Sequence, residues 1–188
     1  MKYFLTETTG LTSIPAGAQV FARGENLMVG IGEKARFEAT GENRFQDLAS
    51  QFNEFSKDVE IIGEIDSSAG SINAFAAITF SPESEFKSVL IVPESLLVIR
   101  SDKTWIASFI ENFQWPEATS FSPQKLSFSQ GQQSQEGFLS SVEKALGQID
   151  DGEISKVVLA RDLVSEKPDD FDIRDAIQRL RQRFPSCW

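Results

Sequence analysis

The residue with the clearest capacity for chemistry is a lysine inside an apolar run. Lys156 lies at the fifth position of the sequence GEISKVVLAR, which covers residues 152–161. A lysine amine can act as a general base only when it is neutral, and apolar neighbours such as Val158 and Ala160 favour the neutral form. The pattern alone nevertheless favours a structural lysine that reaches water or pairs with a carboxylate.

Composition removes several other reaction classes. The 188-residue chain contains no His and a single Cys, Cys187. Without His there is no Ser/His or Cys/His catalytic pair, and zinc has almost none of the ligands that it favours. One Cys cannot form an intrachain disulfide, so the sequence does not indicate an oxidising compartment.

Acidic residues dominate the charge of the chain. The formal net charge of -10 would repel nucleic-acid phosphates and anionic lipid headgroups, so we expect no nucleic acid and no membrane as partners. The pairs Asp150-Asp151 and Asp169-Asp170 lie at a turn and before a helix start, where acidic residues are common, and we predict no metal site there. No signal peptide or membrane span is apparent, and a cytoplasmic protein is the default expectation.

The elements that must position Lys156 are predicted by periodicity. Apolar residues at steps of three and four predict a helix over 138–149, which Asp150-Asp151-Gly152 ends. A strand is expected over 154–164, and its two faces are both largely apolar, as in a strand that is covered on two sides. A last helix is expected from Asp172 to Phe184, where Pro185 stops it.

Upstream of this region the sequence predicts an antiparallel sheet. A hairpin over 19–31 turns at 24–26, and an amphipathic helix follows over 43–55. Strand-like runs at 74–80, 88–92, 96–100 and 105–110 then predict a meander of antiparallel strands. The fold class is therefore α+β, with antiparallel sheets flanked by helices.

A change in amino-acid composition divides the chain into two regions. The stretch 116–135 is polar and contains Pro116 and Pro123, so it is a poor strand or helix. The sequence predicts a first region over 1–115, a linker or loop over 116–135, and a second region over 136–188. The abrupt end after Cys187-Trp188 is unlike the polar, frayed end of most domains and predicts a truncated second region.

The helix, the acidic turn and the GEISKVVLAR run together resemble the segment of isochorismate synthases that introduces their catalytic lysine. The run 74–80 and the sequence SVLIVPE at 88–94 resemble upstream segments of the same family. The resemblance implies that Lys156 is the general base, which takes a proton from the water that attacks ring carbon two of chorismate. A glutamic acid then protonates the hydroxyl that leaves ring carbon four, and isochorismate results.

The same lysine separates related families. Anthranilate and aminodeoxychorismate synthases resemble this fold but generally lack a lysine at this position, because their nucleophile is ammonia. Salicylate synthases share the lysine and eliminate pyruvate after forming isochorismate, so they remain an alternative. Arg161 matches an arginine common in the family segment, and we interpret it as a structural ion-pair donor rather than a substrate contact.

The family enzymes are considerably longer than this chain. Their proton-donating glutamic acid, their magnesium-holding glutamates and their basic substrate-binding residues match no position here, so no substrate-binding residue is assigned. The resemblance implies chorismate and magnesium as partners of a longer isomerase in menaquinone or siderophore biosynthesis, and an incomplete chorismate-utilising fold in this chain. We expect the isolated chain to bind no cofactor, to be inactive and to self-associate through exposed sheet edges. The alternative is a non-catalytic structural or interaction fragment.

Overall fold

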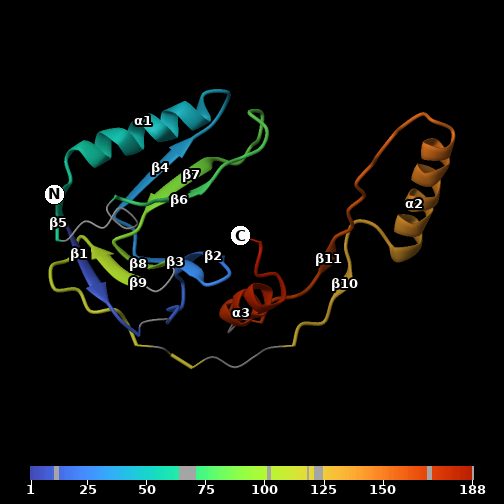
Figure 1. The fold of residues 1–188 in the computed structure, drawn as a ribbon. Helices are drawn as coiled ribbons and strands as arrows, with labels where there is room; N and C mark the ends of the chain where they lie inside the picture. The colour runs from blue at the N-terminus through green and yellow to red at the C-terminus, as the bar shows by residue number, and fades with distance from the viewer. Residues whose placement is uncertain are drawn as a thin grey trace. The chain divides into compact units, whose positions relative to one another are not determined.

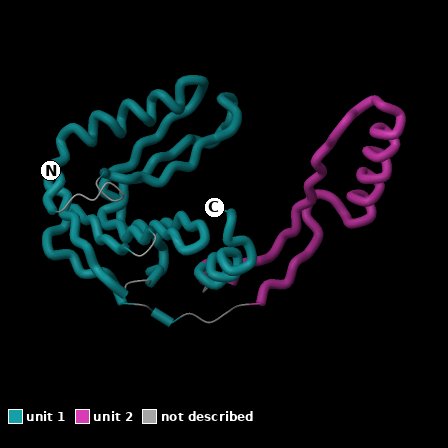
Figure 2. Tube along the Cα trace, in the orientation of Figure 1, with its two compact units in different colours: residues 1–121, 174–188 teal, residues 122–173 magenta. Residues whose placement is uncertain are grey.

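The computed structural model describes residues 1–10, 13–63, 71–100, 103–117, 119–120, 125–168 and 171–187. The chain folds into two compact units (Figure 2), unit 1 with residues 1–121 and 174–188, and unit 2 with residues 122–173. Asp169 and Asp170 lie outside the described residues. The division at 115 and 135 that the sequence indicates stays a prediction.

A six-stranded sheet forms the centre of unit 1, in the order β2-β3-β8-β9-β1-β5. Its strands are β1 Lys2–Thr8, β2 Gln19–Arg23, β3 Asn26–Ile31, β5 Glu60–Ile62, β8 Ser95–Arg100 and β9 Lys103–Ser108. Only β1 and β5 pair in parallel, and the other neighbours are antiparallel. The predicted hairpin over 19–31 is confirmed, with Gly24 at a φ of 55° in its turn.

A smaller antiparallel sheet holds β4 Ala35–Ala39, β6 Phe75–Ala77 and β7 Ser88–Val92, in the order β4-β7-β6. The predicted strands at 88–92 and 96–100 both exist, but they do not pair with each other. The prediction of one continuous meander is wrong at Pro93-Glu94, because β7 lies between β4 and β6 while β8 lies between β3 and β9. Both edges of each strand are therefore already occupied.

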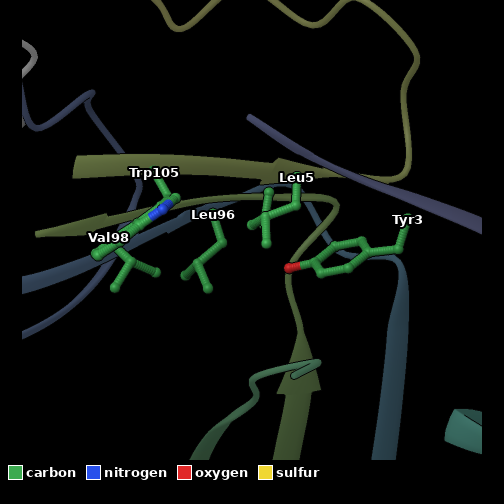
Figure 3. Close-up of a cluster of buried hydrophobic side chains, with 6 residues drawn as sticks. Tyr3, Leu5, Leu96, Val98 and Trp105 are labelled. Atoms are coloured by element: carbon green, nitrogen blue, oxygen red, sulfur yellow. The ribbon is translucent and has the colours of Figure 1, made fainter. Parts of the chain in front are cut away.

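Both faces of the larger sheet are packed. Successive side chains of a strand point to opposite faces, and the strands of this sheet have apolar residues at both sets of positions. One face carries a buried cluster of Tyr3, Leu5, Leu96, Val98, Trp105 and Ala107 (Figure 3). The opposite face carries Leu27, Val29, Leu97 and Trp115. Leu96 and Leu97 are adjacent in β8 and enter different clusters, as the two-residue period of a strand requires. The main core of unit 1 thus lies on either side of β8.

Aromatic contacts join the two sheets through helix α1, Arg44–Lys57 (Figure 1). Phe55 of α1 lies edge-on to Phe37 of β4 at 5.9 Å and to Phe109 at 6.0 Å, measured between ring centroids. Phe109 in turn contacts Tyr3, with a centroid separation of 4.6 Å. Such pairs add to the area that the rings bury. The helix predicted over 43–55 is confirmed.

The start of α1 is held by a buried arginine. Arg44 donates to the carbonyl oxygens of Thr79 at 2.9 Å, Gly41 at 3.0 Å and Phe80 at 2.8 Å. A guanidinium carries no acceptor and several donors, so one side chain can satisfy several backbone oxygens. This arrangement joins the helix to the segment that follows β6.

Helix α3, Arg174–Arg183, belongs to unit 1 and confirms the helix predicted over 172–184. Arg174 is buried at its first turn and donates to the carbonyl oxygen of Ile14 at 3.1 Å and to the hydroxyl of Thr119 at 2.8 Å. At the other end, Arg181 donates to the carbonyl oxygen of Gly24 at 3.0 Å. The helix is therefore attached to the β2–β3 turn and to two preceding loops.

Unit 2 contains helix α2, Gln135–Asp150, and a two-stranded ladder of β10 Ser129–Gln130 with β11 Leu163–Val164. The predicted helix over 138–149 is confirmed. In both units together the chain has the predicted α+β class, with mixed and antiparallel sheets. No helix in the described parts of the chain is long and apolar enough to cross a membrane.

The strand predicted over 154–164 is wrong for residues 154–162. Only Leu163 and Val164 pair with another strand, and the preceding residues form neither helix nor strand. A strand is stabilised by its neighbours, and none of the described strands lies beside residues 154–162. Apolar and β-branched composition therefore does not suffice to form a ladder here.

Candidate active-site segment

The segment that carries Lys156 leaves α2 through a well-formed helix C-cap. Gly152 adopts a left-handed conformation with a φ of 74°. The backbone N–H of Glu153 donates to the carbonyl oxygen of Gln148 at 2.9 Å, and that of Gly152 donates to Ile149 at 3.0 Å. These two bonds are the Schellman pattern, in which glycine avoids the steric cost of the left-handed region. The cap fixes where the GEISKVVLAR segment begins.

The other end of α2 is capped by a serine. Ser134 is the N-cap, and its hydroxyl oxygen accepts a hydrogen bond from the backbone N–H of Gly137 at 3.0 Å. Serine at this position satisfies one of the four backbone donors that a helix leaves unpaired at its start. Both ends of α2 are thus fixed by capping residues, Ser134 at the start and Gly152 after the end.

Lys156 itself is exposed in unit 2, four residues beyond Gly152. Its neighbours Val157, Val158 and Leu159 are also exposed, with 42%, 81% and 38% of their surface accessible. The expectation that apolar neighbours on the same face would bury the amine is not met in this chain, because no strand or helix of the described residues covers the segment. Lys156 and the apolar residues that follow it are therefore exposed together.

Arg161 and Asp162 attach the far end of the segment to the turn before α2. The Nε of Arg161 donates to the carbonyl oxygen of Gln133 at 3.3 Å. The carboxylate of Asp162 accepts from the backbone N–H of Gln132 at 3.0 and 3.1 Å. We call these two adjacent contacts the 161–162 clasp. The bond of Arg161 seen here is to a backbone carbonyl oxygen, and its role as an ion-pair donor stays a prediction.

A glycine makes room for this clasp. A Cβ atom on Gly131 would overlap the carboxylate of Asp162. Neither residue was predicted from the sequence, because Gly131 lies in the polar stretch 116–135 and Asp162 directly follows the GEISKVVLAR run. The useful signal was the lone glycine within the polar run, since a glycine often marks the close approach of another group.

Two of the cavities among the described residues lie in unit 1, and neither of them is lined by Lys156 or Arg161. One has a volume of about 270 Å³ and is lined by the apolar side chains of Val20, Ala22 and α3, together with Arg181 and Cys187. The Nε of Arg181 is buried there without a hydrogen-bond partner among the described residues. The other cavity has a volume of about 520 Å³ and is lined by residues of β1, of β9 and of the segment 110–115.

Magnesium, which the resemblance implies for a longer enzyme, finds no fitting set of ligands in this structure. Among the residues that the structure describes, no three His, Cys, Asp or Glu side chains gather closely enough to hold a metal ion. Asp150 and Asp151 are exposed at the end of α2. Mg²⁺ requires several oxygen ligands in near-octahedral geometry. The described residues therefore do not form a magnesium site of their own.

Comparison with known proteins gives one finding. The family model described as chorismate binding enzyme matches residues 108–188, a little under half of the chain, from the last residue of β9 through unit 2 and α3. Neither the curated proteins nor the solved structures give a significant match. The matched part contains Lys156, Arg161, Asp162 and Gly131. The match supports the chorismate-binding enzyme family for this part of the chain.

Proposed function

We propose that residues 108–188 are part of a chorismate-utilising enzyme that makes isochorismate, with Lys156 as the general base. The observation that carries this proposal is the family match together with a lysine at the position where water-activating members have one. Among chorismate-utilising enzymes, a lysine here distinguishes the use of water from the use of ammonia. The parent enzyme would thus be an isomerase.

The proposed role of Lys156 is proton removal from the attacking water. Its amine must be neutral, whereas the ordinary pKa of a lysine is about 10.4. A lysine that is enclosed by apolar surface loses the solvation that stabilises its charge, and its pKa falls. Val157, Val158 and Leu159 would form part of that surface once another element covers the segment.

In this chain the segment is exposed, so we propose that the isolated chain is inactive. A positioned general base contributes about a hundredfold to ten-thousandfold to a rate, and only when it is within reach of the proton and in the correct protonation state. Lys156 is exposed, and no strand or helix among the described residues encloses it. The described part of the chain thus supplies one of the groups that the reaction needs.

The experiment is an assay of the purified 188-residue chain with chorismate and Mg²⁺, with products separated by chromatography. We expect no isochorismate from the wild-type chain, from Lys156→Ala or from the matched control Lys144→Ala, an exposed lysine of α2. Isochorismate from the wild type and from Lys144→Ala, but not from Lys156→Ala, would mean that the chain has a complete site. Salicylate among the products would instead identify the alternative, a salicylate synthase.

A second candidate function is a non-catalytic interaction fragment. The observation that favours it is the exposure of Val158, Leu163 and Val164, of which half or more of the surface is accessible. Exposed apolar residues in adjacent positions often mark an interface. Self-association of the purified chain, measured by sedimentation equilibrium, tests this second function.

A further inference from the structure

Residues 154–162 offer a backbone that the described structure does not use. Among the described residues, the one backbone–backbone hydrogen bond of this segment is from the Ile154 N–H to the carbonyl oxygen of Gln148, at 3.3 Å. Figure 1 shows the segment leaving α2 and returning to β11 without a strand beside it. Unpaired N–H and C=O groups next to exposed apolar side chains form a template for pairing with another strand.

The order of charges in the segment selects one way to pair two copies. If two copies run antiparallel with Leu159 opposite Leu159, the Lys156 of each copy lies opposite the Asp162 of the other. Directly opposite residues of an antiparallel pair lie on the same face and close together. Symmetry produces this pair of opposite charges twice.

Neighbouring registers are less favourable. A shift of one residue in one direction places Lys156 opposite Arg161, so that two positive charges face each other, and it does so twice. A shift of one residue in the other direction places Lys156 opposite Leu163 and Asp162 opposite Val157, so neither charge has a partner. A shift that places Val158 opposite itself puts Lys156 opposite Ala160 and Asp162 opposite Ile154, which leaves both charges without a partner. Charge complementarity therefore favours the register centred on Leu159.

The same register matches the remaining residues. Val158 then faces Ala160, and Ile154 faces Val164. One edge of β11 is already paired with β10, so the opposite edge is the one that remains for a second copy. Pairing across that edge places Ile154 and Ser155 of one copy beside β11 of the other, so each two-stranded ladder of β10 and β11 gains a third strand. A sheet of three or more strands is more stable than an isolated hairpin.

We infer that residues 154–164 are a docking surface for a second copy of this chain, which pairs antiparallel about Leu159 with reciprocal Lys156–Asp162 contacts. This inference does not rest on the proposed function. In the dimer Lys156 is a charged ammonium next to a carboxylate, whereas a base must be neutral. The dimer is therefore a form of the chain in which Lys156 cannot act as the base.

The first test is sedimentation equilibrium of the full chain over a wide concentration range. Wild-type chain should fit a reversible monomer–dimer equilibrium. Lys156→Glu places two pairs of like charges in the interface, and it should weaken the dimer by about tenfold or more. Lys144→Glu makes the same change of charge on the exposed face of α2 and should leave the dissociation constant unchanged.

The second test is an exchange of the two charges. Asp162→Lys alone weakens the dimer but also removes the carboxylate that binds the Gln132 N–H. The double variant Lys156→Glu with Asp162→Lys lacks that carboxylate too, yet it restores opposite charges between copies. Recovery of the dimer in the double variant supports the proposed register. A monomer at every concentration, unlimited aggregation, an unaffected Lys156→Glu, or a double variant as weak as Lys156→Glu would each overturn it.

Discussion

The carboxylate of Asp162 accepts hydrogen bonds from the backbone N–H of Gln132 at 3.0 and 3.1 Å, across 30 residues of chain. The next residue back, Arg161, donates to the carbonyl oxygen of Gln133 at 3.3 Å. Two adjacent side chains of opposite charge thus hold a backbone donor and a backbone acceptor of the turn before α2. This clasp and the C-cap at Gly152 define both ends of the segment that contains Lys156.

Gly131→Ala tests the clasp. The added methyl group would overlap the carboxylate of Asp162 and force it away from Gln132. A hydrogen bond to a charged group that is solvent-exposed contributes on the order of 1 kcal/mol, so the loss should be of that size. We expect faster hydrogen exchange at the Gln132 amide, measured by NMR.

Gly147→Ala is the matched control for this substitution. Gly147 lies in α2 with nothing within 4 Å of an added Cβ. Alanine is a better helix former than glycine by about 0.5–1 kcal/mol, so this variant should stabilise unit 2 slightly. Unchanged exchange at Gln132 in Gly131→Ala would contradict the clasp, as would an equal effect of both substitutions.

The burial of Tyr3 should make the stability of the fold depend on pH in the alkaline range. Burial raises the pKa of its phenol above the ordinary value of 10.0. The unfolded chain therefore releases this proton at a lower pH than the folded chain does. The stability that neutral Tyr3 contributes is fully present below about pH 10 and declines as the pH rises above that value.

Tyr3 is the single tyrosine of the chain, so tyrosinate absorbance reports on this residue alone. We expect the absorbance to appear only together with unfolding. Tyr3→Phe keeps the ring in the core and should move the midpoint of alkaline unfolding to higher pH. Tyrosinate that forms at the ordinary pKa in a chain that is still folded would show that Tyr3 is not buried in solution.

Arg174→Ala tests the attachment of α3 to unit 1. Arg174 is buried and binds Ile14 and Thr119, and its removal leaves their oxygens without this donor. The cost of such a loss is about 1–3 kcal/mol, measured as a lower free energy of unfolding in urea.

Arg179→Ala serves as the control in the same helix. Arg179 is exposed and pairs with Asp175 one turn away, a contact that contributes at most a few tenths of a kcal/mol. An equal loss of unfolding free energy in the two alanine variants would contradict the prediction that the buried hydrogen bonds of Arg174 stabilise the fold more than the exposed ion pair of Arg179.

Local sequence signals predicted the helices well because the stripes and caps that define them are local. In α1 the predicted stripe is real: Leu48 is buried, and Phe52 and Phe55 are half-buried. Phe45 belongs to the same periodic pattern, yet 55% of its surface is exposed. The guanidinium of Arg44 lies 4.8 Å from the centroid of that ring, which a count of apolar spacing cannot anticipate.

The strands were harder to predict from the sequence than the helices, because the partners of a strand are distant in sequence. The run from 88 to 100 contains two strands, but which sheet each one joins depends on β3, β4, β6 and β9. Residues 154–162 have strand composition on both faces and form no strand beside the described elements. The candidate site shares this dependence, since whether Lys156 is enclosed is decided by what covers the segment rather than by its own residues.

The most direct test of the account places residues 108–188 into an active isochorismate synthase, in exchange for the matching segment. The chimera is assayed with chorismate and Mg²⁺ in oxygen-18-labelled water. We predict labelled isochorismate, a loss of at least about a hundredfold in rate for Lys156→Ala, and an unchanged rate for Lys144→Ala. A folded, active chimera in which Lys156→Ala keeps its rate, or one that yields product only with ammonia, would contradict the assignment of Lys156 as the base that activates water.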